Sequence, residues 1–551
     1  MIKRETEPTL AQKTALCAVL IMISVIGYTM LMFSMRVPMS AYSAVLPIAG
    51  IAVYSTLCDR KLLKSLVICL VILIVWAAVC AKIFDWSYDG MYYHKQAVIT
   101  LAEGWNPLFQ SSTNAQHLNS NANLWMWLDN YPKGIWICSA AIYILTGFLE
   151  TAKAVNILFI IMLFSAAYST FRTVFDAKSG RAAIFAAAVC LNPVYIVQIF
   201  TSYNDFAVGV LIITAALLGM KIYSETADKC DYALLGCVAA MSCLVKFTAP
   251  LLVGLVLFAY GIGYAIKLWC GKTEPKAILM RFIKPAAVIF SGFIIGVVFL
   301  GYNPYMWHIT HGQNIVYPVL GENSYDIMNT NPPAGFDGKI GCEKYFLSLA
   351  SETSNNIDGG YKLKIPFTVH ENELDYLSHA DTRLGGFGVW FSGIFILAAL
   401  FAAIAAIARQ KMRGEIAVLL IAFFILGLFF PEAWWARYAS YTFYIPVFLL
   451  FYASEHSGVK PAAYAVVLVL VINSIMNIVC VIKDGNEITD GINNMLDDIK
   501  SQNKRVEIRI NDFPSHLKLF EEAGIPFVVA PDSIPDETIF YEDTKYRFLD
   551  D

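Results

Sequence analysis

Long apolar segments separated by short polar connections make up most of the chain. The segments are about 17–25 residues long, the length that a helix needs to cross about 30 Å of hydrocarbon. The pattern predicts an α-helical polytopic membrane protein with about thirteen transmembrane helices. The expected spans are 15–35, 38–58, 65–83, 153–171, 182–201, 206–222, 232–249, 250–267, 285–302, 387–408, 415–430, 440–454 and 461–482.

The composition agrees with this assignment. Of the 551 residues, 58% are hydrophobic and 15% are charged, which is too apolar for a water-soluble protein of this size. The formal net charge of -3 identifies no partner, and we expect no nucleic-acid binding. Most of the 12 cysteines lie in apolar segments, and their spacing predicts neither a disulfide framework nor a CxxC-type metal site.

Basic residues near the first spans predict the orientation. The segments 3–13 and 60–64 carry lysine and arginine, so the positive-inside rule places both of them, and the N-terminus, in the cytoplasm. The polar segment 84–133 then lies on the outer side of a cytoplasmic membrane.

The apolar segment 134–149 is short for a crossing. If it crossed, the basic segments 172–181 and 267–284 would lie outside, whereas they return to the cytoplasm if it stays in the outer interface. We therefore interpret it as a juxtamembrane segment. The large outer loops are then 84–152 and 303–386.

The tail 483–551 is polar and follows the transmembrane domain 1–482. Its pattern predicts a small extracytoplasmic α/β domain. A module that packs on the outer loops without chemistry of its own also fits this pattern. The expected elements are a helix over 488–502, a strand over 506–510, a helix over 515–523 and a strand over 526–530.

The segment 84–106 brings polar chemistry directly after an apolar span. Asp85 and Asp89 are four residues apart, so both lie on one face if the segment is helical, and His94 lies about one turn further on. Two carboxylates and an imidazole at a membrane surface indicate proton transfer or cation binding. A solvated interfacial loop with aspartate caps is the alternative interpretation.

Four more charged residues lie at outer ends of spans: Lys133, Asp205, Lys246 and Arg437. A charge within the bilayer costs about 2.5–3.5 kcal/mol on insertion scales, so each needs a reason. Taken singly, Lys246 fits a snorkelling side chain, Arg437 an interfacial anchor and Asp205 a helix cap. Together with the acids of 84–106 they indicate a site for a lipid phosphate beside a carboxylate.

Four features resemble the GT-C glycosyltransferases, in particular the branch of protein O-mannosyltransferases and lipid A aminoarabinose transferases. They are YDGMYYH at 88–94, YPKGIW at 131–136, Asp205 and Lys246. The resemblance covers about residues 65–270. It implies an integral membrane enzyme that moves a sugar from a polyprenyl-phosphate donor to a glycan, lipid or protein acceptor on the outer face.

The resemblance also implies roles for single residues. Asp89, with Asp85 and Asp205, is the expected catalytic acid group. The expected ligands of the donor phosphate are Lys246, Arg437, Lys133 and His94, and the candidates for acceptor or sugar binding are Tyr93, Trp105, His311 and Arg383. No nucleotide is required, in agreement with the absence of a P-loop or Rossmann glycine pattern.

Other interpretations remain open. A divalent cation (Mg, Mn or Ca) is a possible cofactor, for which His308 and His311 form only an isolated pair. A flippase or transporter of lipid-linked saccharides would hold its charges near the bilayer midplane. An oligosaccharide ligase or polymerase would use a pyrophosphate-linked donor.

Overall fold

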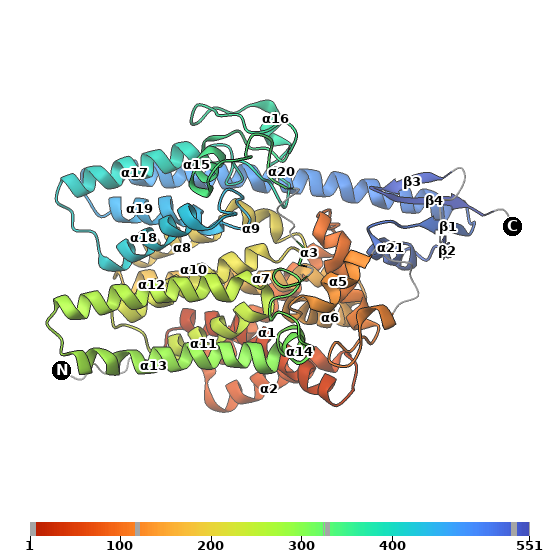
Figure 1. Ribbon diagram of the computed structural model, residues 1–551, viewed down its shortest axis with the longest axis horizontal. Coiled ribbons are helices and arrows are strands. Elements are labelled where there is room, and N and C mark those ends of the chain that lie inside the picture. The colour runs from red at the N-terminus through yellow and green to blue at the C-terminus, as the bar shows by residue number, and fades with distance from the viewer. Residues whose placement is uncertain (1–6, 116–121, 323, 326–330, 531–536, 550–551) are drawn as a thin grey trace.

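A computed structural model describes residues 7–115, 122–322, 324–325, 331–530 and 537–549, most of them in helices (Figure 1). The expected spans fall on helices. The helices are α1 (Leu10–Ser34), α2 (Tyr42–Cys58), α3 (Arg60–Cys80), α7 (Asn156–Thr173), α8 (Ser179–Cys190), α10 (Asp205–Tyr223), α11 (Lys229–Val245), α12 (Thr248–Cys270), α13 (Pro275–Ile294), α17 (Phe391–Ile407), α18 (Gly414–Phe429), α19 (Tyr444–Ala453) and α20 (Lys460–Ser501).

Seven helical segments of the described chain are long and apolar enough to cross a membrane. They are Leu10–Ser34, Arg60–Cys80, Leu149–Thr173, Asp205–Tyr223, Thr248–Cys270, Pro275–Leu300 and Lys460–Ser501. This finding supports a membrane protein. The larger number of crossings and the orientation stay predictions.

Shorter elements lie in the polar segments and connections. They are η1 (Gly90–His94), α4 (Lys95–Ala102), η2 (Ser112–Ala115), α5 (Ala122–Asn130), α6 (Gly134–Thr146), η3 (Leu149–Val155), α9 (Pro193–Gln198), η4 (Ile295–Leu300), α14 (Tyr302–Thr310), α15 (Gly341–Ala350), α16 (Glu371–Leu374), η6 (Ser440–Phe443), η7 (Pro514–His516) and α21 (Leu517–Glu522). The predicted juxtamembrane segment forms α6, whose 13 residues rise only about 20 Å.

The helices pack into one bundle. In its N-terminal half α1 packs against α3, α7 and α11, and α10 packs against α7 and α12. In its C-terminal half α17 packs against α19 and α20. Two glycines allow a close approach of α13 and η4 to α11: a Cβ at Gly292 would lie 2.5 Å from the Gly236 carbonyl oxygen, and one at Gly296 would lie 2.7 Å from that of Ala240.

One expected span is interrupted. The prediction of a single helix over 182–201 is wrong, because α8 ends at Cys190 and α9 begins at Pro193. Proline has no backbone N–H to continue the helix, and the Asn192 side chain accepts a hydrogen bond from the Val194 N–H, which starts the new helix.

The C-terminal region departs further from expectation. No separate helix occupies 488–502, because α20 runs without a break for 42 residues through 482–483. Its far end carries a sheet of order β2-β1-β4-β3 (Figure 1). The strands β1 (Val506–Arg509) and β2 (Phe527–Val529) are parallel and match the prediction; β4 (Thr544–Phe548) and β3 (Thr538–Tyr541) pair antiparallel and were not predicted.

Candidate functional site

A cavity of about 790 Å³ lies where the bundle meets the C-terminal sheet. Residues from four separate parts of the chain line it. The lining includes Trp86, Ser87, Tyr88, Asp89, Tyr92, Tyr93, Trp127 and Tyr131 from the first polar segment; Tyr203 and Lys246 from connections between helices; Asn331, Asn355, His379, Asp381, Arg383, Trp435, Arg437 and Tyr438 from the segment 331–438; and Ile488, Asp512, Tyr541 and Glu542 from the C-terminal region.

Two cations and two acids form an ionic cluster at this cavity, hereafter the quartet: Asp89, Asp205, Lys246 and Arg437. Lys246 forms an ion pair with Asp205. An Nη1 of Arg437 lies 3.4 Å from Asp89 Oδ2 and 3.7 Å from Asp205 Oδ2. The side chain of Asp205 is 3% exposed and that of Asp89 is 25% exposed, so Asp89 is the acid that faces the open space.

Helix ends position the members of the quartet. Asp205 is the first residue of α10, where the positive end of the helix dipole stabilises a carboxylate. Lys246 directly follows α11 in an extended conformation, and α12 begins two residues later. Arg437 lies in the connection between α18 and η6, where its guanidinium packs over the rings of Trp435 and Tyr438 at 4.2 and 4.8 Å. Such cation–π contacts fix the plane of the guanidinium.

A turn with a structural acid precedes Asp89. Asp85 is buried and accepts hydrogen bonds from the Ser87 hydroxyl (2.6 Å) and from the backbone N–H of Ser202 (2.8 Å). A Cβ at Gly90 would lie 2.5 Å from Asp85 Oδ2, so only glycine fits beside this carboxylate. Asp85 therefore ties the turn to the 201–203 connection and is not among the residues that line the cavity. Its predicted catalytic role stays a prediction.

The environment of Asp89 favours proton uptake. Burial raises the pKa of the Asp89 carboxyl, and the neighbouring Arg437 and Lys246 oppose that rise. A carboxylate with a raised pKa is a better proton acceptor than an ordinary aspartate. Asp89 thus combines access to the cavity with the properties of a general base.

Two predicted phosphate ligands lie away from the cavity lining. His94 is buried behind Tyr93 and accepts a hydrogen bond from Trp136 Nε1 at 2.7 Å; burial first, and then Lys246 and Arg437, hold its pKa well below the usual value. A neutral imidazole supplies no positive charge. Lys133 donates to the carbonyl oxygens of Asp129 (2.9 Å) and Tyr131 (2.8 Å), and burial lowers its pKa to about 7.

The four predicted acceptor or sugar ligands divide equally. Tyr93 and Arg383 line the cavity, and Arg383 is held by Asn355 Oδ1 (2.5 Å) and Asn331 Oδ1 (2.6 Å). Trp105 is buried and donates to the Gln110 carbonyl, and the exposed His311 stacks on Trp307. Neither of these two lines the cavity.

The His308–His311 pair forms no metal site. His308 contacts Asn130 Oδ1 (3.0 Å) and the Ile315 carbonyl (3.2 Å), whereas His311 bonds within its own helix turn. Across the described ranges no group of three or more His, Cys, Asp or Glu side chains is arranged to hold a metal ion.

Several lining residues escaped prediction. Asp381 lies beside Arg383 with an O–N distance of 3.7 Å, and the sequence DTR was a possible signal for this pair. Tyr203 and Tyr438 come from aromatic-rich connections that also fit interfacial anchors. Tyr541 and Glu542 could not be found, because the hairpin that carries them was not predicted.

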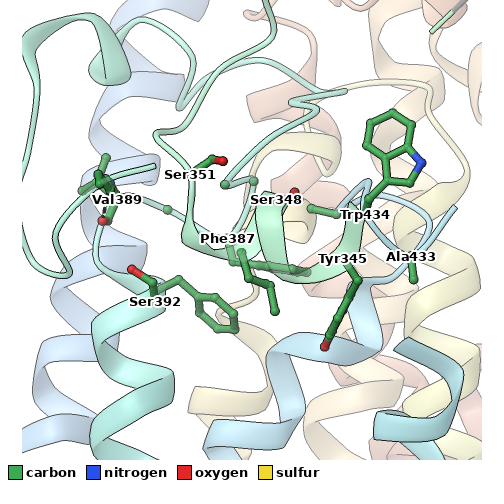
Figure 2. A pocket seen from close by; sticks show the side chains of 15 residues that line it. Tyr345, Ser348, Ser351, Phe387, Val389, Ser392, Ala433 and Trp434 are labelled. Atoms are coloured by element: carbon green, nitrogen blue, oxygen red, sulfur yellow. Dashed lines mark hydrogen bonds between the residues drawn. The ribbon is translucent and has the colours of Figure 1, made fainter. Parts of the chain in front are cut away.

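Residues of α15 and of the segment before α17 lie next to the connection that carries Arg437. Figure 2 shows Tyr345 of α15, Phe387 and Trp434 around a second cavity, of about 10 Å³. A space of this volume holds about one water molecule. This second cavity is therefore a small gap in the packing next to the aromatic connection, whereas the cavity beside the quartet is large enough for a substrate.

No family model matches this chain, and no curated protein matches it.

Proposed function

We propose that the protein is an integral membrane glycosyltransferase of the GT-C kind. It moves a sugar from a polyprenyl-phosphate donor to a glycan, lipid or protein acceptor at the outer face of the cytoplasmic membrane. The observation that carries the proposal is the quartet, which joins a proton acceptor to two cations in a polar cavity at the end of apolar helices.

The cations are suited to the donor phosphate. Lys246 supplies a compact ammonium and Arg437 a planar guanidinium, the two groups that proteins use to bind phosphate oxygens. Lys246 and Arg437 both line the cavity, so their charges lie where an incoming anion would bind. The apolar helices on which these connections rest suit a donor with a lipid tail.

The reaction follows from this placement. The acceptor O–H gives its proton to Asp89 while its oxygen forms a bond to C1 of the sugar, and the bond from C1 to the phosphate oxygen breaks with its electron pair. The phosphodiester carries one negative charge, and the released phosphate monoester carries two. Lys246 and Arg437 stabilise the additional charge as it develops.

The charge of the quartet favours a monophosphate over a pyrophosphate donor. Two cations and two carboxylates have a formal sum of zero, and Arg383 at the same cavity also has an acid neighbour, Asp381. A pyrophosphate diester carries two negative charges, and a phosphodiester carries one. The quartet compensates the single charge better than the double charge. A ligase that uses a pyrophosphate-linked donor and a flippase are the two alternatives that the experiment below distinguishes from this transferase.

The test is transfer of label. Purified protein in detergent is given radiolabelled polyprenyl-phosphate sugars and a crude envelope acceptor, with Asp89→Asn beside wild type and the exposed Asp498→Asn as the matched control. We expect transfer by wild type and by Asp498→Asn, and loss in a folded Asp89→Asn. Full activity of Asp89→Asn would refute the role of Asp89. Movement of intact donor across vesicle membranes without a covalent product would instead establish a flippase.

A further inference from the structure

The C-terminal unit, residues 506–549 as described, docks directly on the segment that carries Asp89. The Ser515 hydroxyl donates to the Met91 carbonyl oxygen at 2.8 Å, and the Tyr88 ring packs edge-on against Phe513 with 5.4 Å between centroids. The Tyr88 hydroxyl lies 3.5 Å from Asp512 Oδ2. The unit is therefore part of the site and more than an appended module.

Asp89 lies between two different walls of the cavity. On one side Arg437 approaches it to 3.4 Å and belongs to the proposed phosphate end. On the other side the neighbouring residue Tyr88 contacts Asp512 through its hydroxyl group. Tyr541 and Glu542 line the cavity on this side as well. Since the donor phosphate occupies the cationic side, the acceptor reaches Asp89 from the side of the C-terminal unit.

The C-terminal hairpin brings the carboxylate of Glu542 to the cavity. Glu542 stands at the tip of the β3–β4 hairpin, where Tyr541 pairs with Thr544, and its φ is 51°. Glycine or asparagine adopts this left-handed conformation at lower cost than glutamate. The side chain of Glu542 lies on the cavity lining, where its carboxylate can accept hydrogen bonds from a ligand.

The chemistry of this wall suits a carbohydrate. Carboxylates accept hydrogen bonds from neighbouring hydroxyl groups, and tyrosine rings offer flat apolar faces for the C–H side of a sugar ring. Tyr88 is half exposed and Tyr541 is partly exposed, so both rings are accessible. A lipid acceptor would need a mainly apolar wall, which these residues do not provide.

We propose that the C-terminal unit forms the acceptor subsite and that the acceptor is a saccharide, with Asp512 and Glu542 receiving its hydroxyl groups and Tyr541 packing on its ring. This inference rests on the proposed function and narrows its acceptor from three classes to one. The reaction then forms a glycosidic bond to a saccharide oxygen, and the proton of that hydroxyl group goes to Asp89.

Binding is measured first, because it does not depend on transfer. A saccharide fraction released from cell envelopes by mild acid is added to the full-length protein, and the fluorescence of the cavity tryptophans, Trp86, Trp127 and Trp435, is recorded. We expect a saturable change in wild type. A peptide digest and a lipid extract of the same envelopes are the comparison probes. Binding of either of these without binding of the saccharide fraction would overturn the inference.

Variants then distinguish a loss of acceptor binding at this wall of the cavity from a loss of folding. Glu542→Gly relieves the backbone cost, so it is expected to fold at least as well as wild type, and Asp512→Asn preserves shape. Each should raise the acceptor KM about tenfold, the loss expected for one hydrogen bond to a charged group, and leave the donor KM unchanged. Glu521→Gln, on the exposed side of the same unit, is the matched control.

Unchanged acceptor KM in both variants would refute the acceptor subsite while leaving the transferase intact. Saccharide binding by a wild-type protein that transfers from no donor would instead refute the proposed function and retain the subsite. The two failures are thus distinguished by the binding and the transfer measurements.

Discussion

Arg437 contacts both acids of the quartet, at 3.4 Å from Asp89 and 3.7 Å from Asp205. Both contacts are made by the same nitrogen, Nη1, and stacking on Trp435 fixes the plane of the guanidinium that carries it. At this scale the site depends on geometry as well as charge. A lysine at 437 keeps the charge and loses the planar group that stacks on Trp435 and Tyr438.

Arg437→Lys is therefore expected to reduce kcat by roughly 100-fold or more, because removal of one preorganised donor from developing charge costs that much. Single-turnover transfer from the polyprenyl-phosphate sugar measures the effect. Arg505→Lys, at an exposed position directly before the C-terminal unit, is the control and should transfer at the wild-type rate. An Arg437→Lys enzyme as fast as wild type would show that charge alone suffices.

The raised pKa of Asp89 predicts the pH profile. The base form is needed, so kcat/KM should fall as the pH drops through the raised pKa, and the midpoint should lie above the value of about 3.9 for an ordinary aspartate. Initial rates from pH 4 to pH 8 measure it. A midpoint at or below the ordinary value would contradict the burial that we assign to this carboxyl.

At the scale of the element, the turn before Asp89 is held by a buried charge network. Glu150 of η3 accepts hydrogen bonds from Lys95 of α4 (2.5 Å), from Lys153 (2.5 Å) and from the Asp85 backbone N–H (2.9 Å). The side chains of Lys95 and Lys153 are 4% and 0% exposed. Three elements thus converge on one carboxylate.

Glu150→Gln leaves two buried ammonium groups without their charged partner, and the expected loss is about 3–5 kcal/mol of unfolding free energy. Thermal unfolding in detergent measures it as a lower Tm. The exposed pair of Lys483 and Glu487 offers a matched control, since Glu487→Gln should change the unfolding free energy by less than about 0.5 kcal/mol. Equal Tm values for the two variants would contradict the network.

Gly90 couples this network to Asp89. Its absent side chain makes room for Asp85, so Gly90→Ala must displace the Asp85 carboxylate from Ser202 and shift the start of η1. We expect a loss of about 1–3 kcal/mol in stability and a lower kcat. Gly50→Ala, in a helix with nothing within 4 Å of the added Cβ, is the control for both readouts.

At the scale of the whole molecule, helical spans were the most predictable feature. Backbone groups in hydrocarbon must bond within their own segment, so apolar composition alone indicates helices. The continuation of α20 past residue 482 and the β3–β4 hairpin had no such signal, because polar helix and short mixed strands depend on packing. The same limit applies to the site: position near a span end indicated Asp89 and Arg437, but it could not tell which way Lys133 or His94 would point.

The fold also allows a test of the orientation. Figure 1 places the α12–α13 and α17–α18 connections at the end of the bundle that carries the N-terminus, opposite the sheet. These connections contain Lys272, Arg409, Lys411 and Arg413, and the adjoining parts of α12 and α13 contain Lys267, Lys276 and Arg281. The positive-inside rule then predicts that this end is cytoplasmic and that the cavity opens at the outer face, where the proposed lipid-linked donor would be used.

Reporter fusions measure on which side of the membrane each end of the bundle lies. Alkaline phosphatase fused after residue 551 should be active, and the same enzyme inserted at 410 should be inactive, while a fluorescent protein at those positions should show the reverse. The insertion at 410 is the internal control, since it lies in the basic connection. An inactive phosphatase at the C-terminus would place the quartet on the cytoplasmic side, and a transferase there would need a donor presented from the inner leaflet.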